Sequence, residues 1–175
     1  MKKLTLLTLS LIASFGMINS ANAVDGVINF TGEITAQSCK IDGDTQGNKT
    51  VNLGFVPASA LAAEGQTAGN QVFSMKLTEC TGAATKVATH FESLSLASAE
   101  NRLKLDASST AKNVEIALYD QNGVLQPVNG TVPEASYIDI TDNTATLSYI
   151  AAYYATGVAS AGSANSVVSY TLSYQ

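Results

Sequence analysis

The sequence predicts an all-β protein that folds as an antiparallel sandwich. Short segments alternate apolar and polar residues with a period of two, which is the pattern of a half-buried strand. Clusters of Gly, Asn, Asp and Ser separate these segments at the spacing typical of a sandwich. The pair Asn122-Gly123, between two such segments, is a strong hairpin signal because both residues tolerate a positive φ.

Eight strands are expected along the chain. The period of two is clear in the motif Leu147-x-Tyr149-x-Ala151-x-Tyr153. An alanine-rich piece at 58–64 is expected to form one or two helical turns between strands. The expected strands are 27–36, 50–56, 71–78, 86–94, 114–119, 124–127, 145–154 and 167–174.

The first 23 residues are expected to be a signal peptide. Lys2 and Lys3 precede an apolar stretch, and Ala21-Asn22-Ala23 fits the small-x-small pattern of a cleavage site. A membrane anchor fits less well, because the apolar run is short and interrupted by Thr and Ser. Cleavage after Ala23 would leave 152 of the 175 residues, enough for one domain with a proper core.

Charge and cysteine content narrow the function. Without the two signal lysines, the chain has seven basic and fourteen acidic residues. This net negative charge argues against nucleic acid or an anionic membrane as partner. The exported cysteines Cys39 and Cys80 are expected to form a structural disulfide, worth roughly 4 kcal/mol in the chain-entropy model. A C-x-x-C redox pair is absent, and the single histidine, His90, argues against a zinc site.

An amphipathic strand is expected near each end of the sequence. The apolar face of the last strand consists of Val168, Tyr170, Leu172 and Tyr174. One face of the first strand consists of Gly26, Ile28, Phe30, Gly32 and Ile34. Alternation alone also fits an ordinary first strand of a closed sandwich, and a surface aromatic at Tyr174.

The order of short motifs is more specific than any one of them. In addition to the N-terminal face and Cys39, the motifs are Val51-Asn52-Leu53-Gly54, Ala60-Leu61-Ala62-x-Glu64-Gly65, Leu77-x-x-Cys80, Asn113-Val114-x-Ile116, Asp120-x-x-Gly123, Tyr153-Tyr154-Ala155-Thr156-Gly157 and Gly162-x-Ala164-Asn165. In this order, they resemble the major pilins of the chaperone–usher type 1 fimbrial family over essentially the whole mature length. Gly162, fourteenth from the end, and the penultimate Tyr174 match the C-terminal signature of that family.

The resemblance implies an incomplete immunoglobulin-like antiparallel sandwich that lacks its last strand. A periplasmic pilus chaperone would lend a strand first, and at the outer-membrane usher the N-terminal extension of the next subunit would replace it. The implied product is a homopolymer, a surface fimbrium that supports bacterial adhesion and is exported through the periplasm. The implied domains are a signal peptide (1–23), a donor-strand extension (24–35) and a pilin domain (36–175).

The resemblance also assigns roles to residues. The donor strand would consist of Gly26, Ile28, Phe30, Gly32 and Ile34. The residues that line the groove or contact the chaperone would be Gly162, Val168, Tyr170, Leu172 and Tyr174. No catalytic residue, cofactor or metal is expected.

Other functions remain open at this stage. A minor or adaptor pilin near the fibre tip belongs to the same class, whereas a monomeric secreted sandwich that binds a ligand, or a periplasmic enzyme, belongs to another. Asp42-x-Asp44-x-Gln46-Gly47 has Leu53 where a calcium loop needs Glu, so it is expected to be a turn. His90 lacks a nearby nucleophile motif, and Asp139 and Asp142 are expected at a strand end and in its turn.

Overall fold

Antiparallel pairing of eight strands builds the protein, in a computed structural model that describes residues 28–32, 34, 36, 38–42 and 47–175. The chain divides into two units, Met1–Glu33 and Ile34–Gln175, and the strands lie in the second. The strands are β1 (Ser38–Ile41), β2 (Thr67–Thr81), β3 (Lys86–Glu92), β4 (Leu103–Lys104), β5 (Val114–Asp120), β6 (Ile138–Asp139), β7 (Ala145–Ala155) and β8 (Ser169–Tyr174). Two short 3-10 helices are also present, η1 (Ala58–Leu61) and η2 (Glu134–Ser136).

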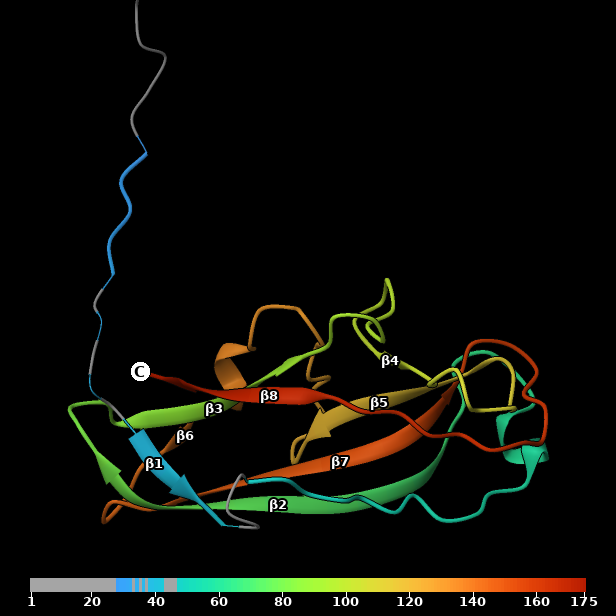
Figure 1. The fold of residues 1–175 in the computed structure, drawn as a ribbon, viewed down its shortest axis with the longest axis horizontal. Coiled ribbons are helices and arrows are strands. Elements are labelled where there is room, and N and C mark those ends of the chain that lie inside the picture. Colours follow the sequence, from blue (N-terminus) through green and yellow to red (C-terminus); the bar gives the residue numbers. More distant parts are fainter. Residues whose placement is uncertain (1–27, 33, 35, 37, 43–46) are drawn as a thin grey trace, which may run out of the picture. The chain divides into compact units, whose positions relative to one another are not determined.

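The strands form two sheets. The larger has the order β1-β2-β7-β5-β4, and the smaller has the order β6-β3-β8. Figure 1 shows both layers, with β8 beside β3 and β7 beside β2. All pairings between named strands are antiparallel, so the predicted all-β antiparallel sandwich is confirmed.

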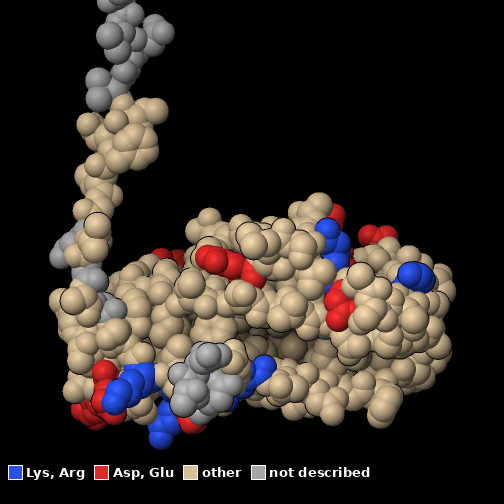
Figure 2. All heavy atoms as spheres, viewed as in Figure 1, with Lys and Arg blue, Asp and Glu red and all other residues tan. Residues whose placement is uncertain are grey.

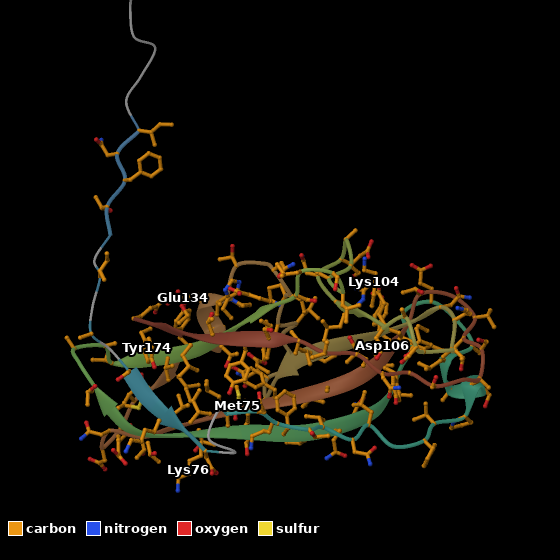
Figure 3. All side chains as sticks on the ribbon, in the orientation of Figure 1. Met75, Lys76, Lys104, Asp106, Glu134 and Tyr174 are labelled. Carbon is orange, nitrogen blue, oxygen red and sulfur yellow. A yellow bond between two sulfur atoms is a disulfide. The ribbon has the colours of Figure 1, made fainter. Side chains whose placement is uncertain are left out.

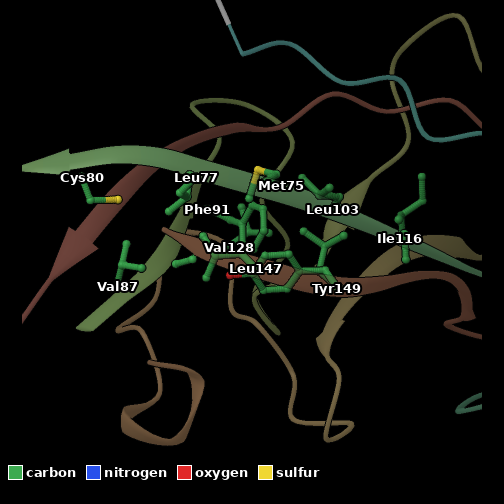
Figure 4. Packing of buried hydrophobic residues seen from close by; sticks show 13 residues of the cluster. Met75, Leu77, Cys80, Val87, Phe91, Leu103, Ile116, Val128, Leu147 and Tyr149 are labelled. Carbon is green, nitrogen blue, oxygen red and sulfur yellow. The ribbon is translucent and has the colours of Figure 1, made fainter. Parts of the chain in front are cut away.

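The core lies between the inward faces of the sheets. Alternate residues are buried there in the middle of β2 and in the first half of β7, including Met75 and Leu77 from β2 and Leu147 and Tyr149 from β7. Figure 4 shows these side chains packed against Phe91 of the smaller sheet. The period of two in the sequence therefore sorts residues between core and solvent as predicted.

The predicted disulfide is present between Cys39 of β1 and Cys80 of β2. It joins the short first strand to the longest strand of the molecule. The predicted turn at Asn122-Gly123 is also present, because Gly123 has a φ of 79° and the Val124 carbonyl accepts a hydrogen bond from Asp120 N–H. Asp139 ends β6 and Asp142 lies in the following turn, as expected.

Three of the expected strands do not form in the described residues, so these predictions were wrong. The range 50–56 carries no strand, because its backbone has no ladder partner and Gly54 turns the chain with a φ of 70°. The range 124–127 makes only an isolated bridge at Leu125, since Pro127 cannot donate to a ladder. The described part of 27–36 is not a strand either.

Other elements were missed or misjudged in length. The strands β1, β4 and β6 have only two to four residues, too few to display a period. The sequence predicted only 71–78 for β2, which extends through a register shift between Ala68 and Gln71. Gly69 has a φ of 71° at this irregularity, a conformation that favours glycine. The helical turn expected at 58–64 is confirmed as η1.

Candidate functional site

Among the described strands, the C-terminal strand β8 pairs with a neighbour along one edge only. Its backbone pairs with β3, and within the described part of the chain β8 is the last strand of its sheet. Its inward side chains are only half-buried, although they pack against the main core. They are Val168, Tyr170, Leu172 and Tyr174, the face that the sequence predicted. An unpaired edge beside half-buried apolar side chains is an incomplete piece of sheet.

The segment 47–56 forms the opposite border of this incomplete region. Val51 and Leu53 point toward the core and are also half-buried, so the segment alternates like a strand without pairing like one. The expectation of a strand at 50–56 was therefore wrong about the ladder, although the segment alternates in burial as a strand does. Half-buried apolar side chains thus lie on both β8 and this segment, and the region between the two is called the groove below.

Two tyrosines of β8 contact parts of the chain other than its paired strand β3, and one of them reaches the segment 47–56. The hydroxyl of Tyr170 donates a hydrogen bond to the carbonyl oxygen of Gly47 at 2.6 Å. Burial raises the pKa of Tyr174, and a hydrogen bond with the backbone of Cys39 opposes this shift. Figure 3 shows Tyr174 at the end of β8, close to β1. The groove is therefore crossed by side chains where no backbone pairing closes it.

A cavity of about 480 Å³ opens where the chain enters β8. Its walls come from 52–58, from Tyr153 of β7 and from 159–165. Its apolar lining includes Phe55, Val56, Leu61, Val114 and Ala159. Figure 2 shows the surface hollowed below the chain that leads into β8. The cavity is large enough and apolar enough to receive a large aliphatic side chain.

Gly162 holds one wall of this cavity in place. A Cβ at this position would collide with the backbone N of Ala111 and lie 2.6 Å from Thr110 Oγ1. The amides of Thr110 and Ala111 both donate hydrogen bonds to the carbonyl oxygen of Ser163, at 3.1 and 3.0 Å. Close contact between two backbones thus explains why glycine stands fourteenth from the end.

The described N-terminal residues have few neighbours. Ile28, Phe30 and Ile34 expose 80%, 91% and 102% of their surface, which is unusual for large apolar side chains. No atom lies within 4 Å of where a Cβ would stand on Gly32. Gly26 lies outside the described residues, as do the signal peptide and most of the expected calcium-like turn.

The sequence did not predict the residues opposite β8. Gly47, Phe55 and Tyr153 border the groove or its cavity, but none belongs to a pattern that points there. His90 lies half-buried in β3, with its Nδ1 3.0 Å from Glu92 Oε1, in agreement with a structural role. Among the described residues, no group of three or more His, Cys, Asp or Glu side chains could hold a metal, and no helix is long and apolar enough for a membrane span.

Comparisons with known proteins identify the family. The family model described as "Fimbrial protein" matches residues 28–175. The F17 fimbrial protein of Escherichia coli is 38% identical, over 87% of this chain and 89% of that protein. The major fimbrial subunit SMF-1 of Stenotrophomonas maltophilia is 36% identical, over 89% of this chain and 95% of that protein. The type-1 fimbrial protein A chain of E. coli K12 is 30% identical, over 98% and 94%.

Solved structures agree on the fold. The P pilus rod subunit PapA matches with a TM-score of 0.60 and 17% identity, over 78% of this chain and 99% of that one. A subunit of a chaperone–usher pilus matches with a TM-score of 0.64 and 17% identity, over 87% and 96%. These matches support the predicted incomplete immunoglobulin-like sandwich. The chain belongs to the fimbrial protein family and is a non-enzymatic structural subunit of surface fimbriae.

Proposed function

We propose that this subunit polymerises by donor-strand complementation, with the extension 24–35 of each copy entering the groove of the next. One observation supports this most directly. The inward face of β8 is half-buried, and no described strand pairs with the outer edge of β8. A strand from another chain would supply backbone hydrogen bonds and apolar side chains at once.

The chemistry of the extension complements the groove. Ile28, Phe30 and Ile34 recur with the period of two that an inserted strand needs. Moving each of these exposed side chains into an apolar groove would stabilise the complex by roughly 1.5–3 kcal/mol, before ordering costs. Gly26 and Gly32 share this face and would let the backbone approach closely.

An antiparallel pairing of the donor strand with β8 would define which end of the donor strand lies at the cavity. If the donor strand runs antiparallel to β8, its C-terminal end lies where the chain enters β8. Ile34 would then occupy the cavity lined by Phe55 and Val56. Gly26, eight residues earlier, would lie about 27 Å away, near the C-terminal end of β8.

A periplasmic pilus chaperone and an outer-membrane usher are the further partners that we propose. An unpaired apolar edge is prone to aggregation, so the subunit needs a temporary strand before its neighbour arrives. We also infer the role of major rather than tip subunit, since the relative SMF-1 is named a major fimbrial subunit. The polymer would be the fibre that supports adhesion, after removal of the signal peptide 1–23.

Deleting 24–35 tests the donor role. The shortened subunit should still be recovered as a chaperone complex, because its groove is intact, but it should form no fibres by electron microscopy. A matched pair of substitutions tests whether the apolar face of the extension enters the groove. Phe30→Ser, on this face, should block assembly, whereas Thr31→Ser, on the opposite face, should not. Fibres assembled from the shortened subunit would overturn the proposal.

A further inference from the structure

The hydrogen bond between Tyr170 and Gly47 connects β8 to a segment that forms no strand ladder with it in the described residues. Tyr170 lies in the middle of β8, and its hydroxyl donates to the Gly47 carbonyl oxygen at 2.6 Å. Gly47 is buried, has a φ of 72°, and would place a Cβ 2.7 Å from the Tyr170 oxygen. Glycine therefore permits both the turn of the chain and the close approach of the hydroxyl.

A tyrosine side chain with its hydrogen bond is long enough to span the space that one strand needs. Adjacent strands lie about 4.8 Å apart, so two strands that flank a third are separated by about 9.6 Å. A tyrosine side chain followed by a hydrogen bond spans a gap of this kind, whereas a direct backbone ladder would close it. The bridge thus sets the two borders apart instead of bringing them into register.

The two crossing tyrosines differ in what they reach. Tyr174 contacts the backbone of Cys39, which the disulfide to Cys80 and the pairing of β1 with β2 already fix in place. Tyr170 reaches a segment that belongs to no strand in the described structure. The position of the segment that begins at Gly47 therefore depends more on its side-chain contacts than that of β1 does.

We propose that Tyr170 is a positioning residue for subunit assembly: it holds β8 and the segment that begins at Gly47 one strand width apart before the donor strand arrives. This inference rests on the proposed donor-strand function. Without the hydroxyl, the borders can approach each other to shield their apolar side chains from water. A donor strand must then reopen the groove, which slows its entry. Once inserted, the donor strand fixes both borders through its own backbone bonds, so its departure rate changes little.

The experiment separates association from dissociation. The chain without its signal peptide, 24–175, carries Phe30→Ser in every variant so that its own extension does not compete, and it is mixed with a fluorescent synthetic peptide of the parental sequence 24–35. Capture and release of the peptide are followed by anisotropy. Tyr170→Phe should lower the association rate roughly 3- to 10-fold, the factor that a lost hydrogen bond represents, and leave the dissociation rate within about twofold. Gly47→Ala, which disturbs the same contact from the other border, should act in the same direction.

Tyr137→Phe is the matched control. The hydroxyls of Tyr137 and Ser173 lie 2.7 Å apart, and Ser173 is on the outward face of β8, so neither rate should change. An unchanged association rate in Tyr170→Phe, or a loss that appears only as faster dissociation, would overturn the inference while leaving the donor role intact. Failure of the parent chain to capture the peptide would overturn the proposed function and this inference with it.

Discussion

The rings of Phe91 and Tyr149 pack edge to face, with their centres 5.2 Å apart and their planes at 82°. Phe91 belongs to β3 in the smaller sheet and Tyr149 to β7 in the larger one, so this pair joins the two layers. Both side chains are almost completely buried. Edge-to-face pairs of this kind contribute about 0.5–1.5 kcal/mol beyond their burial.

Phe91→Ala should therefore lower the free energy of unfolding by about 3–5 kcal/mol, through lost burial and the cavity left behind. Guanidinium unfolding of the purified chain measures this change. Leu94→Ala, two residues beyond the same strand at a fully exposed position, should change it by less than about 0.5 kcal/mol. Equal effects of the two substitutions would contradict the assignment of Phe91 to the core.

Gly32→Asn should slow polymerisation without affecting the fold of the free subunit. The position is open, with no atom within 4 Å of a new Cβ, so the free chain tolerates the side chain. Inserting it into an apolar groove buries an amide that lacks partners, at a cost of about 1–3 kcal/mol, which corresponds to a factor of about 5 to 150 in rate. Assembly of chaperone complexes followed over time measures the effect, with Asn29→Ser as a control on the opposite face. Parental kinetics in the Gly32 variant would count against its place in the groove.

Gly162→Ala should destabilise the entrance to β8. The new methyl group would collide with the backbone of Thr110 and Ala111, which cannot move aside as a flexible side chain could. We expect a loss of about 1–3 kcal/mol in thermal or guanidinium unfolding. Gly157→Ala is the matched control, because the atoms nearest to its new methyl belong to the Asn113 side chain at 3.5 Å, an ordinary contact. The prediction is wrong if both variants retain parental stability.

Arg102→Ala should lower the stability of the fold more than the removal of an exposed charge does. The Nε of Arg102 donates to Glu115 Oε2 at 2.8 Å, and the guanidinium lies 3.9 Å from the centre of the Tyr154 ring. Both charged side chains are nearly buried, so removing one leaves the other without its partner, at a cost of about 3–5 kcal/mol. Lys40→Ala breaks an exposed pair with Glu79 and should cost under about 1 kcal/mol. Thermal unfolding compares the two, and a smaller loss for Arg102→Ala would refute the ranking.

Stability should fall at alkaline pH, in part through Tyr149. Burial raises the pKa of its hydroxyl above the ordinary value of 10.0. Between pH 10 and the raised value, the unfolded chain loses this proton while the folded chain keeps it, so the free energy of unfolding decreases as the pH rises. Below pH 10 this contribution is fully present. Tyr149→Phe should show a shallower decline above pH 10 than the parent chain, each referred to its own value at pH 7, and an equally steep decline would contradict the prediction.

The long central strands and the turn between β5 and Leu125 could be predicted from the sequence. Their signals are local: β7 buries alternate residues from Ala145 to Ala151, and Asn122-Gly123 tolerates the backbone angles of the turn. Strands such as β4 and β6, with two residues each, depend on partners brought near by the rest of the fold. The range 50–56 shows the converse, because a strand was expected there and Val51 and Leu53 do pack against the core, but no ladder forms.

The sequence by itself determined that β8 has an apolar face, since alternate residues of a strand must point the same way. It also determined that the extension 24–35 carries a similar face. Only the tertiary structure decided what stands opposite β8. Tyr170 and Gly47 are separated by 123 positions, and their contact depends on how two sheets pack, which no local pattern encodes. The same holds for Gly162. Its distance from the end could be read from the sequence, but the need for glycine there arises from the backbone of Ala111, which belongs to a distant part of the chain.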